Sequence, residues 1–446
     1  MLAAAVTMTA CASAPPRAGF ADVQTLVRDR TDARIQWNQH SADDSAAARA
    51  VDSLLAAPLT ADAAVQIALL NNRHLQAAYG ELGVAQADLV QAGLLRNPLV
   101  QGALKFGRGA ATTGFEFGIV QEFLALLQRP ARQRAAGAAL ARTRLDVAMA
   151  VTDVATETRR AYYEAQAAEQ VRELRGTVAE AASAAADIAR RQRDAGNITE
   201  LDLATERAMA EDAALALTSA AAEATEQRQA LLALMGMAGR ETPIGLPARL
   251  PDVPAAPLPS FAVLDSLALA RRLDLLAARQ AILAAGADAG LARTQALVPD
   301  LELGVQVERD VEGSRAIGPT LGVRIPLFDQ GQAVNAAGRA RVRASQDAYA
   351  ALAVDLRADV RRAAARMTGA AARATRLLTV VLPLRETIVR ETQLQYNGML
   401  VGVFQLLQVK RDQIEAGSQY VTALRDYWTA RAELERAIGG RLPAGA

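Results

Sequence analysis

The chain repeats one plan twice, and this repeat restricts its fold more than any other feature of the sequence. Residues 71–78 match residues 271–278, and a glycine turn at 195–198 recurs at 397–400. Segments that recur in the same order fold as copies of one supersecondary unit. A proline-rich connector at 241–260 separates the two copies. We therefore expect an internally duplicated fold.

Each half is expected to contain a helix, two strands, a very long helix, a turn and a last helix. The clearest strands are 301–308 and 320–327, where apolar residues alternate with polar ones. Residues 115–120 alternate in the same way in the first half, and 99–106 alternate less clearly. Because successive side chains of a strand point to opposite faces, each strand has one apolar and one polar face.

A soluble sandwich would show the same alternation, but two arguments favour a membrane. Only two hairpins interrupt the long helices, and a lone hairpin is marginal in water. Each strand is close to the roughly 9–11 residues that cross a bilayer as a tilted strand, and no run approaches the roughly 18–20 apolar residues of a spanning helix. Four strands cannot close a barrel, and open edges are not tolerated in lipid. Several copies must therefore pool their strands, and the alternation does not choose between two copies and three.

The helices between the strands are very long. No proline occurs between 130 and 195, which allows a rod on the order of 100 Å at about 1.5 Å per residue. Apolar and small residues recur at spacings of three and four, which is typical of a coiled-coil seam. Pro383 should kink the second long helix. A soluble coiled coil would explain these helices but not the hairpins.

Composition argues against an enzyme and against a nucleic-acid partner. The net charge is +1, so no strong field attracts nucleic acid. The only histidines, His40 and His74, are isolated, and we interpret them as surface residues rather than metal ligands. Glu157 and Glu164 lie among arginines, as on the charged face of a helical bundle. With no catalytic constellation and no phosphate-binding Gly-Lys loop, we expect no activity, cofactor or metal site.

The N-terminus carries the only cysteine, Cys11, so disulfides within the chain are excluded. A short apolar leader runs into Met8-Thr9-Ala10-Cys11, which resembles a bacterial lipobox in which the cysteine is acylated. The charged region of a normal signal peptide is missing, so either the start codon is assigned too late or the match is accidental. We predict lipidation at Cys11, with a chance cysteine in an alanine-rich leader as the alternative.

Several stretches together carry a family resemblance. They are Gln91-Ala92-Gly93-Leu94-Leu95-Arg96-Asn97-Pro98, Val120-Gln121-Glu122-Phe123, Ile325-Pro326-Leu327-Phe328-Asp329-Gln330-Gly331, and Asp426-Tyr427-Trp428 followed by Gly439-Gly440. From about residue 59 to 440 the chain resembles the TolC-like outer-membrane efflux proteins. Residues 398–407 look similar to the CzcC-like metal-efflux branch.

This resemblance implies a mainly α fold with a small β part. Three copies would share a twelve-stranded transmembrane barrel, which a helical tunnel continues across the periplasm. The homotrimer would dock onto a periplasmic adaptor protein that serves an inner-membrane pump. It would conduct substrates passively out of the cell as part of a tripartite efflux or type I secretion-like system, with heavy metals and drugs among the candidate cargoes. The alternative is a soluble periplasmic coiled-coil scaffold or adaptor protein.

The resemblance also places the gate and the adaptor-docking tip in the turns 196–202 and 398–405. The expected tip residues are Gly196, Asn197, Thr199, Glu200, Asp202, Gly398, Val401, Phe404 and Gln405. Both glycines are expected to adopt a left-handed turn conformation. Well-known members have an acidic ring at the second turn, but the matching positions here are apolar or neutral, which argues against an acidic gate there. Glu200 and Asp202 are the only acidic candidates, and helix capping after Thr199 is an equal alternative for them.

We expect six segments and an outer-membrane location with a lipid anchor, extending into the periplasm. The segments are a signal or lipobox segment (1–11), an N-terminal periplasmic segment (12–58), the first repeat (59–240), the connector (241–260), the second repeat (261–440) and a tail (441–446).

Overall fold

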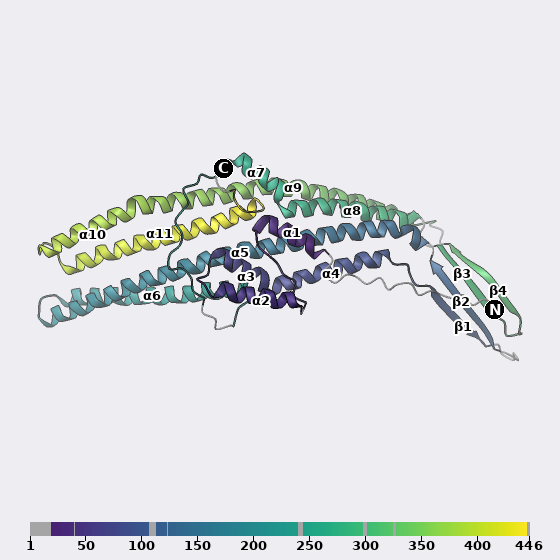
Figure 1. Cartoon of the computed structure of the whole chain (residues 1–446), viewed down its shortest axis with the longest axis horizontal. Helices are drawn as coiled ribbons and strands as arrows, with labels where there is room; N and C mark the ends of the chain where they lie inside the picture. The colour runs from purple at the N-terminus through teal and green to yellow at the C-terminus, as the bar shows by residue number, and fades with distance from the viewer. Residues whose placement is uncertain are drawn as a thin grey trace. The chain divides into compact units, whose positions relative to one another are not determined.

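The computed structural model describes residues 19–39, 41–106, 113–122, 124–239, 244–297, 301–323 and 327–443. These residues form long α-helices and one four-stranded antiparallel sheet (Figure 1). The fold is therefore mainly α with a small β part, as predicted. Cys11 and His40 lie outside the described residues.

The predicted order of elements is found twice. After α1 (Phe20–Thr31) and α2 (Ala42–Leu55), the first half contains α3 (Ala61–Asn71), α4 (Arg73–Gly93), β1 (Leu99–Lys105), β2 (Gly114–Glu122), α5 (Leu124–Asp194) and α6 (Glu200–Leu234). The second half contains α7 (Phe261–Arg271), α8 (Leu273–Leu297), β3 (Leu301–Arg309), β4 (Arg315–Val323), α9 (Gln332–Arg376), the π-helical turn η1 (Leu377–Val381), α10 (Leu382–Asn397) and α11 (Val403–Ala437).

The prolines of the two long helices have different effects on the helix around them. Helix α5 has 71 residues, about 106 Å at 1.5 Å per residue, and Pro130 lies near its start without ending it. In the second half, η1 interrupts the regular helix just before Pro383. Proline has no N–H to donate to the carbonyl four residues earlier, and its ring collides with that carbonyl. A wider π turn relieves this collision, and the kink expected at Pro383 stays a prediction.

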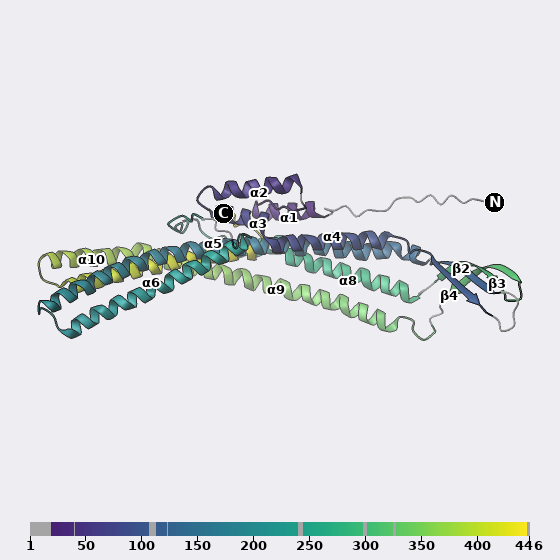
Figure 2. The same ribbon diagram turned by 90° about the horizontal axis from the view of Figure 1, so that it is seen from below.

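The chain divides into two compact units, and each unit combines both halves. The first unit contains the described parts of Met1–Val23, Ala78–Ala148 and Leu273–Ala353, including the whole sheet. The second unit contains the described parts of Gln24–Ala77, Met149–Arg272 and Val354–Ala446. Figure 2 shows the same elements from below.

The sheet has the order β1-β2-β3-β4. Strand β2 of the first half pairs with β3 of the second half, with Phe117 opposite Val307, so one sheet contains both hairpins. Strands β1 and β4 form its two outer edges within the chain. The two hairpins therefore do not exist as separate small sheets.

The predicted boundaries of the last strand were wrong by about five residues. We expected a strand at 320–327, but β4 spans Arg315–Val323. The turn before it closes early, because Asp310 N donates to Ser314 O at 2.9 Å and Gly313 adopts a φ of 94°. Pro319 lies within β4, and an outer strand tolerates a proline because one side of its backbone needs no partner.

The duplication also reaches the packing of the second unit. Gly236 follows α6 and Gly439 follows α11, both with positive φ. A Cβ atom at Gly236 would lie 2.6 Å from the carbonyl oxygen of Asn71, and one at Gly439 would lie 2.8 Å from the carbonyl carbon of Arg271. Only glycine fits against these two backbone segments, which end α3 and α7. The same close approach therefore occurs once in each half.

One helical segment among the described residues, Leu273–Ala296 in α8, is by length and composition apolar enough to cross a membrane, with a mean hydropathy of 1.2. The segment contains no long uninterrupted apolar run, so the sequence alone did not indicate it. Asp274, Arg279, Asp288 and Arg293 punctuate this alanine-rich segment. Core helices of water-soluble proteins have the same length and composition.

Candidate functional site

The first candidate site is the sheet, whose two faces differ in chemistry. The register and the alternation of side chains place one apolar set on a single face: Val100, Leu104, Phe115, Phe117, Ile119, Leu303, Val305, Val307, Ile317, Pro319, Leu321 and Val323. These side chains are not covered by the rest of the chain, since Ile317 is 75% exposed and Leu104 and Leu321 are each 67% exposed. A continuous apolar surface of this kind marks contact with another protein or with lipid.

The opposite face is polar and rich in small residues. It carries Gln101, Ala103, Lys105, Gly114, Glu116, Gly118, Glu122, Glu302, Gly304, Gln306, Glu308, Ala316, Gly318, Thr320 and Gly322, and its two large apolar members are Leu99 and Val120. Lys105 Nζ lies 3.0 Å from Glu116 Oε2 and also contacts Glu308 Oε1. Gln306 Nε2 donates to Glu116 Oε1. These contacts join β1, β2 and β3, and carboxylates outnumber the single lysine on this face.

The second candidate site is the turn between α5 and α6. Gly196 adopts a φ of 76°, as predicted, and ends α5: Gly196 N donates to Arg193 O, and Asn197 N donates to Gln192 O. This pair of bonds is the Schellman motif, in which the left-handed residue is normally glycine. A Cβ atom at Gly196 would meet nothing within 4 Å, so its backbone conformation alone favours glycine.

Helix α6 begins with a capping box. Asp202 N donates to Thr199 Oγ1 at 3.1 Å, and Thr199 N donates to Asp202 Oδ2 at 2.9 Å. Hydrogen bonds from the side chain and backbone of Thr199 lower the pKa of Asp202. Glu200 pairs instead with Arg193 at 3.1 Å. The capping alternative for Asp202 is therefore realised, and Glu200 is already paired with a cation.

The turn between α10 and α11 differs from the prediction that Gly398 is left-handed. Gly398 has a negative φ of −80° with a ψ of 4°, and Met399 is the left-handed residue with a φ of 59°. Met399 N donates to Tyr396 O and Leu400 N donates to Gln395 O, so the Schellman motif places its left-handed position one residue later than the glycine. The expectation of a left-handed Gly398 was wrong, because α10 runs one residue further before it ends.

The rest of this turn leads into α11 and is mostly apolar. Gly402 is the N-cap of α11, and no side-chain hydrogen bond caps the helix there. Val401 and Phe404 are half-buried, whereas Gln405 is exposed. Met399 is 94% exposed and Leu400 is 78% exposed. The apex of this turn is therefore apolar and uncovered within the chain.

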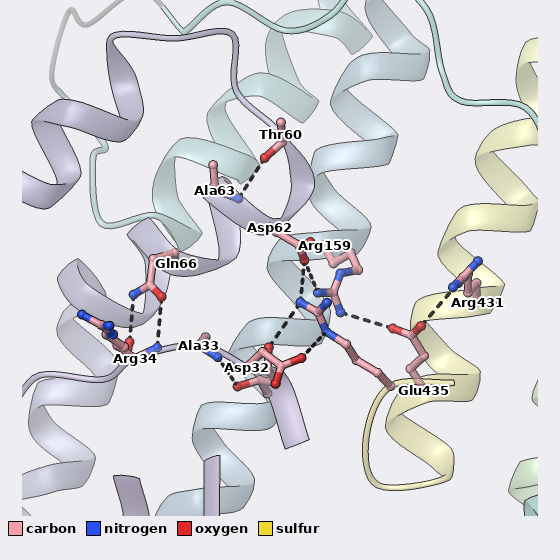
Figure 3. Close-up of polar contacts among 12 residues, drawn as sticks. Asp32, Ala33, Arg34, Thr60, Asp62, Ala63, Gln66, Arg159, Arg431 and Glu435 are labelled. Atoms are coloured by element: carbon pink, nitrogen blue, oxygen red, sulfur yellow. Dashed lines mark hydrogen bonds and ion pairs between the residues drawn. The ribbon is translucent and has the colours of Figure 1, made fainter. Parts of the chain in front are cut away.

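A polar network in the second unit joins segments that are far apart in the sequence (Figure 3). Asp62 of α3 accepts from Arg159 of α5 at 2.8 Å and from Arg441 at 3.0 Å. Arg159 also pairs with Glu435 of α11 at 3.3 Å, where both side chains are largely buried. The network ties the start of the first repeat to the end of the second, and no sequence pattern indicated it.

The connector is held against α5 by two buried glutamines and against α11 by Trp428, which is half-buried. Gln166 and Gln170 are 1% and 4% exposed. The hydrogen bonds run from Gln166 Nε2 to Pro247 O (2.9 Å) and Arg249 O (2.7 Å), from Gln170 Nε2 to Ala248 O (2.7 Å) and from Trp428 Nε1 to Pro251 O (2.8 Å). Two glutamines one helical turn apart in an otherwise apolar seam are the sequence signal that would have indicated this contact.

No cluster of three or more His, Cys, Asp or Glu side chains that could hold a metal ion occurs in the described part of the chain. The sheet and the two turns are therefore the features to compare with known proteins.

Comparisons with known proteins point in one direction. Residues 264–440 match the family described as "Outer membrane efflux protein". The cobalt-zinc-cadmium resistance protein CzcC of Cupriavidus metallidurans is 26% identical over 395 residues, which cover 86% of this chain and 91% of that protein. Over most of its length, the chain is therefore similar to TolC-like outer-membrane efflux proteins.

Solved structures agree on the fold. The CmeC outer-membrane channel of Campylobacter jejuni superposes with a TM-score of 0.72 at 17% identity, covering 86% of each chain. The MtrE outer-membrane channel of Neisseria gonorrhoeae gives 0.68 at 20% identity, covering 85% of this chain and 88% of that one. The TolC-like family contains channel proteins rather than enzymes, and this chain is an outer-membrane efflux channel component.

Proposed function

We propose that three copies of this chain form a passive conduit through the outer membrane and that the chain catalyses no reaction. The observation that carries this proposal is the open four-stranded sheet with an exposed apolar face and a polar face. An open edge is not stable in lipid, so β1 and β4 must pair with strands of neighbouring copies. Three copies give twelve strands, with the apolar faces toward lipid and the carboxylate-rich faces toward the lumen.

The helices continue this conduit into the periplasm, where the two turns form its tip. We assign Gly196, Asn197, Thr199, Glu200 and Asp202 to adaptor docking, together with Gly398, Val401, Phe404 and Gln405. An inner-membrane pump behind the adaptor supplies the energy. Lipidation of Cys11 anchors the chain to the membrane.

The cargo that we favour is a metal cation. The relative from Cupriavidus metallidurans is named for cobalt, zinc and cadmium resistance. The polar face of the sheet carries Glu116, Glu122, Glu302 and Glu308 against Lys105 alone. A lumen lined with an excess of carboxylates concentrates cations and repels anions. Drugs remain the second class of cargo for such a conduit.

Two neighbouring positions on β3 test the assignment of the faces. Val305 is 52% exposed on the apolar face, and Gln306 lies on the polar face. Val305→Arg places a charge in lipid, at a cost of about 2–4 kcal/mol near the bilayer midplane, whereas Gln306→Arg places it in water. We expect Val305→Arg to lose outer-membrane insertion and conductance, and Gln306→Arg to retain both.

The readouts are membrane fractionation, the mass of the detergent-extracted oligomer, and conductance in planar bilayers. If the wild-type chain were monomeric and soluble without detergent, and Val305→Arg behaved like Gln306→Arg, the soluble scaffold or adaptor would replace the conduit.

A further inference from the structure

The apolar face of the sheet ends in two arginines. Arg309 ends β3, Arg315 begins β4, and the two residues are directly paired across the hairpin. Alternation along the strands places both on the same face as Val307 and Ile317. On this face they are the only charged residues of the four described strands.

This pair has no counter-charge in the described part of the chain. Like charges directly opposite each other in a sheet are destabilising, yet no described carboxylate lies in ion-pair distance of either guanidinium. Asp310, the next residue in the turn, accepts instead from Val311 N at 2.7 Å. Arg309 Nε is buried and has no hydrogen-bond partner among the described residues. Among the described residues, neither guanidinium therefore has a carboxylate partner.

The position of Arg309 and Arg315 along the strands indicates the kind of anion that would bind them. All four strands lead toward helices at one end, and Arg309 and Arg315 flank the turn at the other end. From Arg309 to Leu301 the strand has 9 residues, or roughly 30 Å at about 3.3 Å per residue. A tilted strand of this length spans the hydrocarbon layer, so the arginines lie at the level of the headgroups on the side away from the helices.

We propose that Arg309 and Arg315 together bind a phosphate group of an anionic lipid in the outer leaflet. Guanidinium groups bind phosphate through paired N–H donors. Cross-strand neighbours have Cβ atoms about 4.5–5.5 Å apart, so both guanidinium groups reach one phosphate while the acyl chains lie along the apolar rows below. This inference rests on the proposed function, because it needs the apolar face in lipid and the helices in the periplasm.

The test uses the full-length detergent-purified channel and native mass spectrometry of bound lipid. The probes are diphosphorylated lipid A and the same lipid after enzymatic removal of its phosphates, each with and without inorganic phosphate as a competitor. The variant is Arg309→Gln with Arg315→Gln. The matched control is Lys105→Gln, which removes a cation at the same end of the sheet but from the polar face.

We expect the wild type and Lys105→Gln to prefer the phosphorylated lipid by about tenfold or more, and the double variant to lose this preference. A wild type without preference, a double variant that keeps it, or an equal loss in Lys105→Gln would overturn the proposal. Full displacement by inorganic phosphate would identify a free-anion site instead of a lipid site.

Planar-bilayer conductance separates this inference from the proposed function. A double variant that still conducts, without lipid preference in the wild type, would overturn only the lipid site. A wild type that neither enters membranes nor conducts would remove both proposals together.

Discussion

Replacing Met399 with glycine should stabilise the turn between α10 and α11. Met399 occupies a left-handed conformation with a φ of 59°, which costs a residue with a side chain about 1–2 kcal/mol. Its side chain is 94% exposed, so its removal loses no packing. Glycine also raises the conformational entropy of the unfolded chain, which offsets about 0.5–1 kcal/mol of this gain. The net gain is about 0.5–1 kcal/mol, or roughly a two- to fivefold change in the local opening equilibrium.

The turn between α5 and α6 provides the control with the reverse substitution. Gly196 holds the same position of the same motif, and a Cβ atom there would meet nothing within 4 Å. Gly196→Met should therefore destabilise its turn by a similar amount, with no steric contribution. Gly398→Ala is a second control, because Gly398 has a negative φ of −80° and alanine is not strained there.

The assay is amide hydrogen exchange of the detergent-purified full-length chain, followed in peptides that cover each turn. Exchange at the α10–α11 turn should slow in Met399→Gly while the α5–α6 turn stays unchanged, and Gly196→Met should show the reverse. If Met399→Gly had no effect and Gly398→Ala accelerated exchange, Gly398 would be the left-handed residue and the reasoning would be refuted.

Three further predictions concern the second unit. Thr199→Ala removes the N-cap of α6 and should cost about 1 kcal/mol, measured as faster amide exchange in the first turn of α6 only. Gln166→Leu removes the donor to two connector carbonyls and should cost about 1–2 kcal/mol, whereas Gln170→Leu removes the donor to one carbonyl. Limited proteolysis should therefore cut the connector faster in Gln166→Leu than in Gln170→Leu. Hydrogen bonds lower the pKa of Asp44 to about 2, and the hydrogen bond from the backbone N–H of Ser41 contributes most to this shift. The stability that Asp44 gives α2 is therefore complete above its unfolded-state pKa, near 3.8, and is lost as pH falls from about 4 to about 2. Pepsin cleavage near α2 should rise over this range, and Asp44→Asn should remove the pH dependence.

Much of the fold was predictable from the sequence, because its signals are local periods. The alternation of Leu303, Val305 and Val307 separates the two faces of β3 without knowledge of the neighbouring strands. The repeat predicted the order of elements in both halves, and the recurring glycines placed both turns within a few residues. The roles of the tip residues and of Cys11 stay predictions.

Features that depend on where a turn closes, or on contacts between distant segments, were not predictable. The start of β4 depends on how Asp310 and Ser314 close their turn, and the left-handed position of the second turn depends on where α10 ends. The network around Asp62 joins it to Arg441, 379 positions later in the chain. No local pattern specifies such a pair.

The sequence by itself determined the duplicated plan, the helical and strand periods and the two-faced character of the hairpins, since each of these is set by neighbouring residues. The tertiary structure decided that the two hairpins form a single sheet, that Met399 takes the strained position, and that Arg309 meets Arg315 at the edge of the apolar face. These outcomes depend on register and on which backbone amides find acceptors, and the alternation of apolar and polar residues specifies neither.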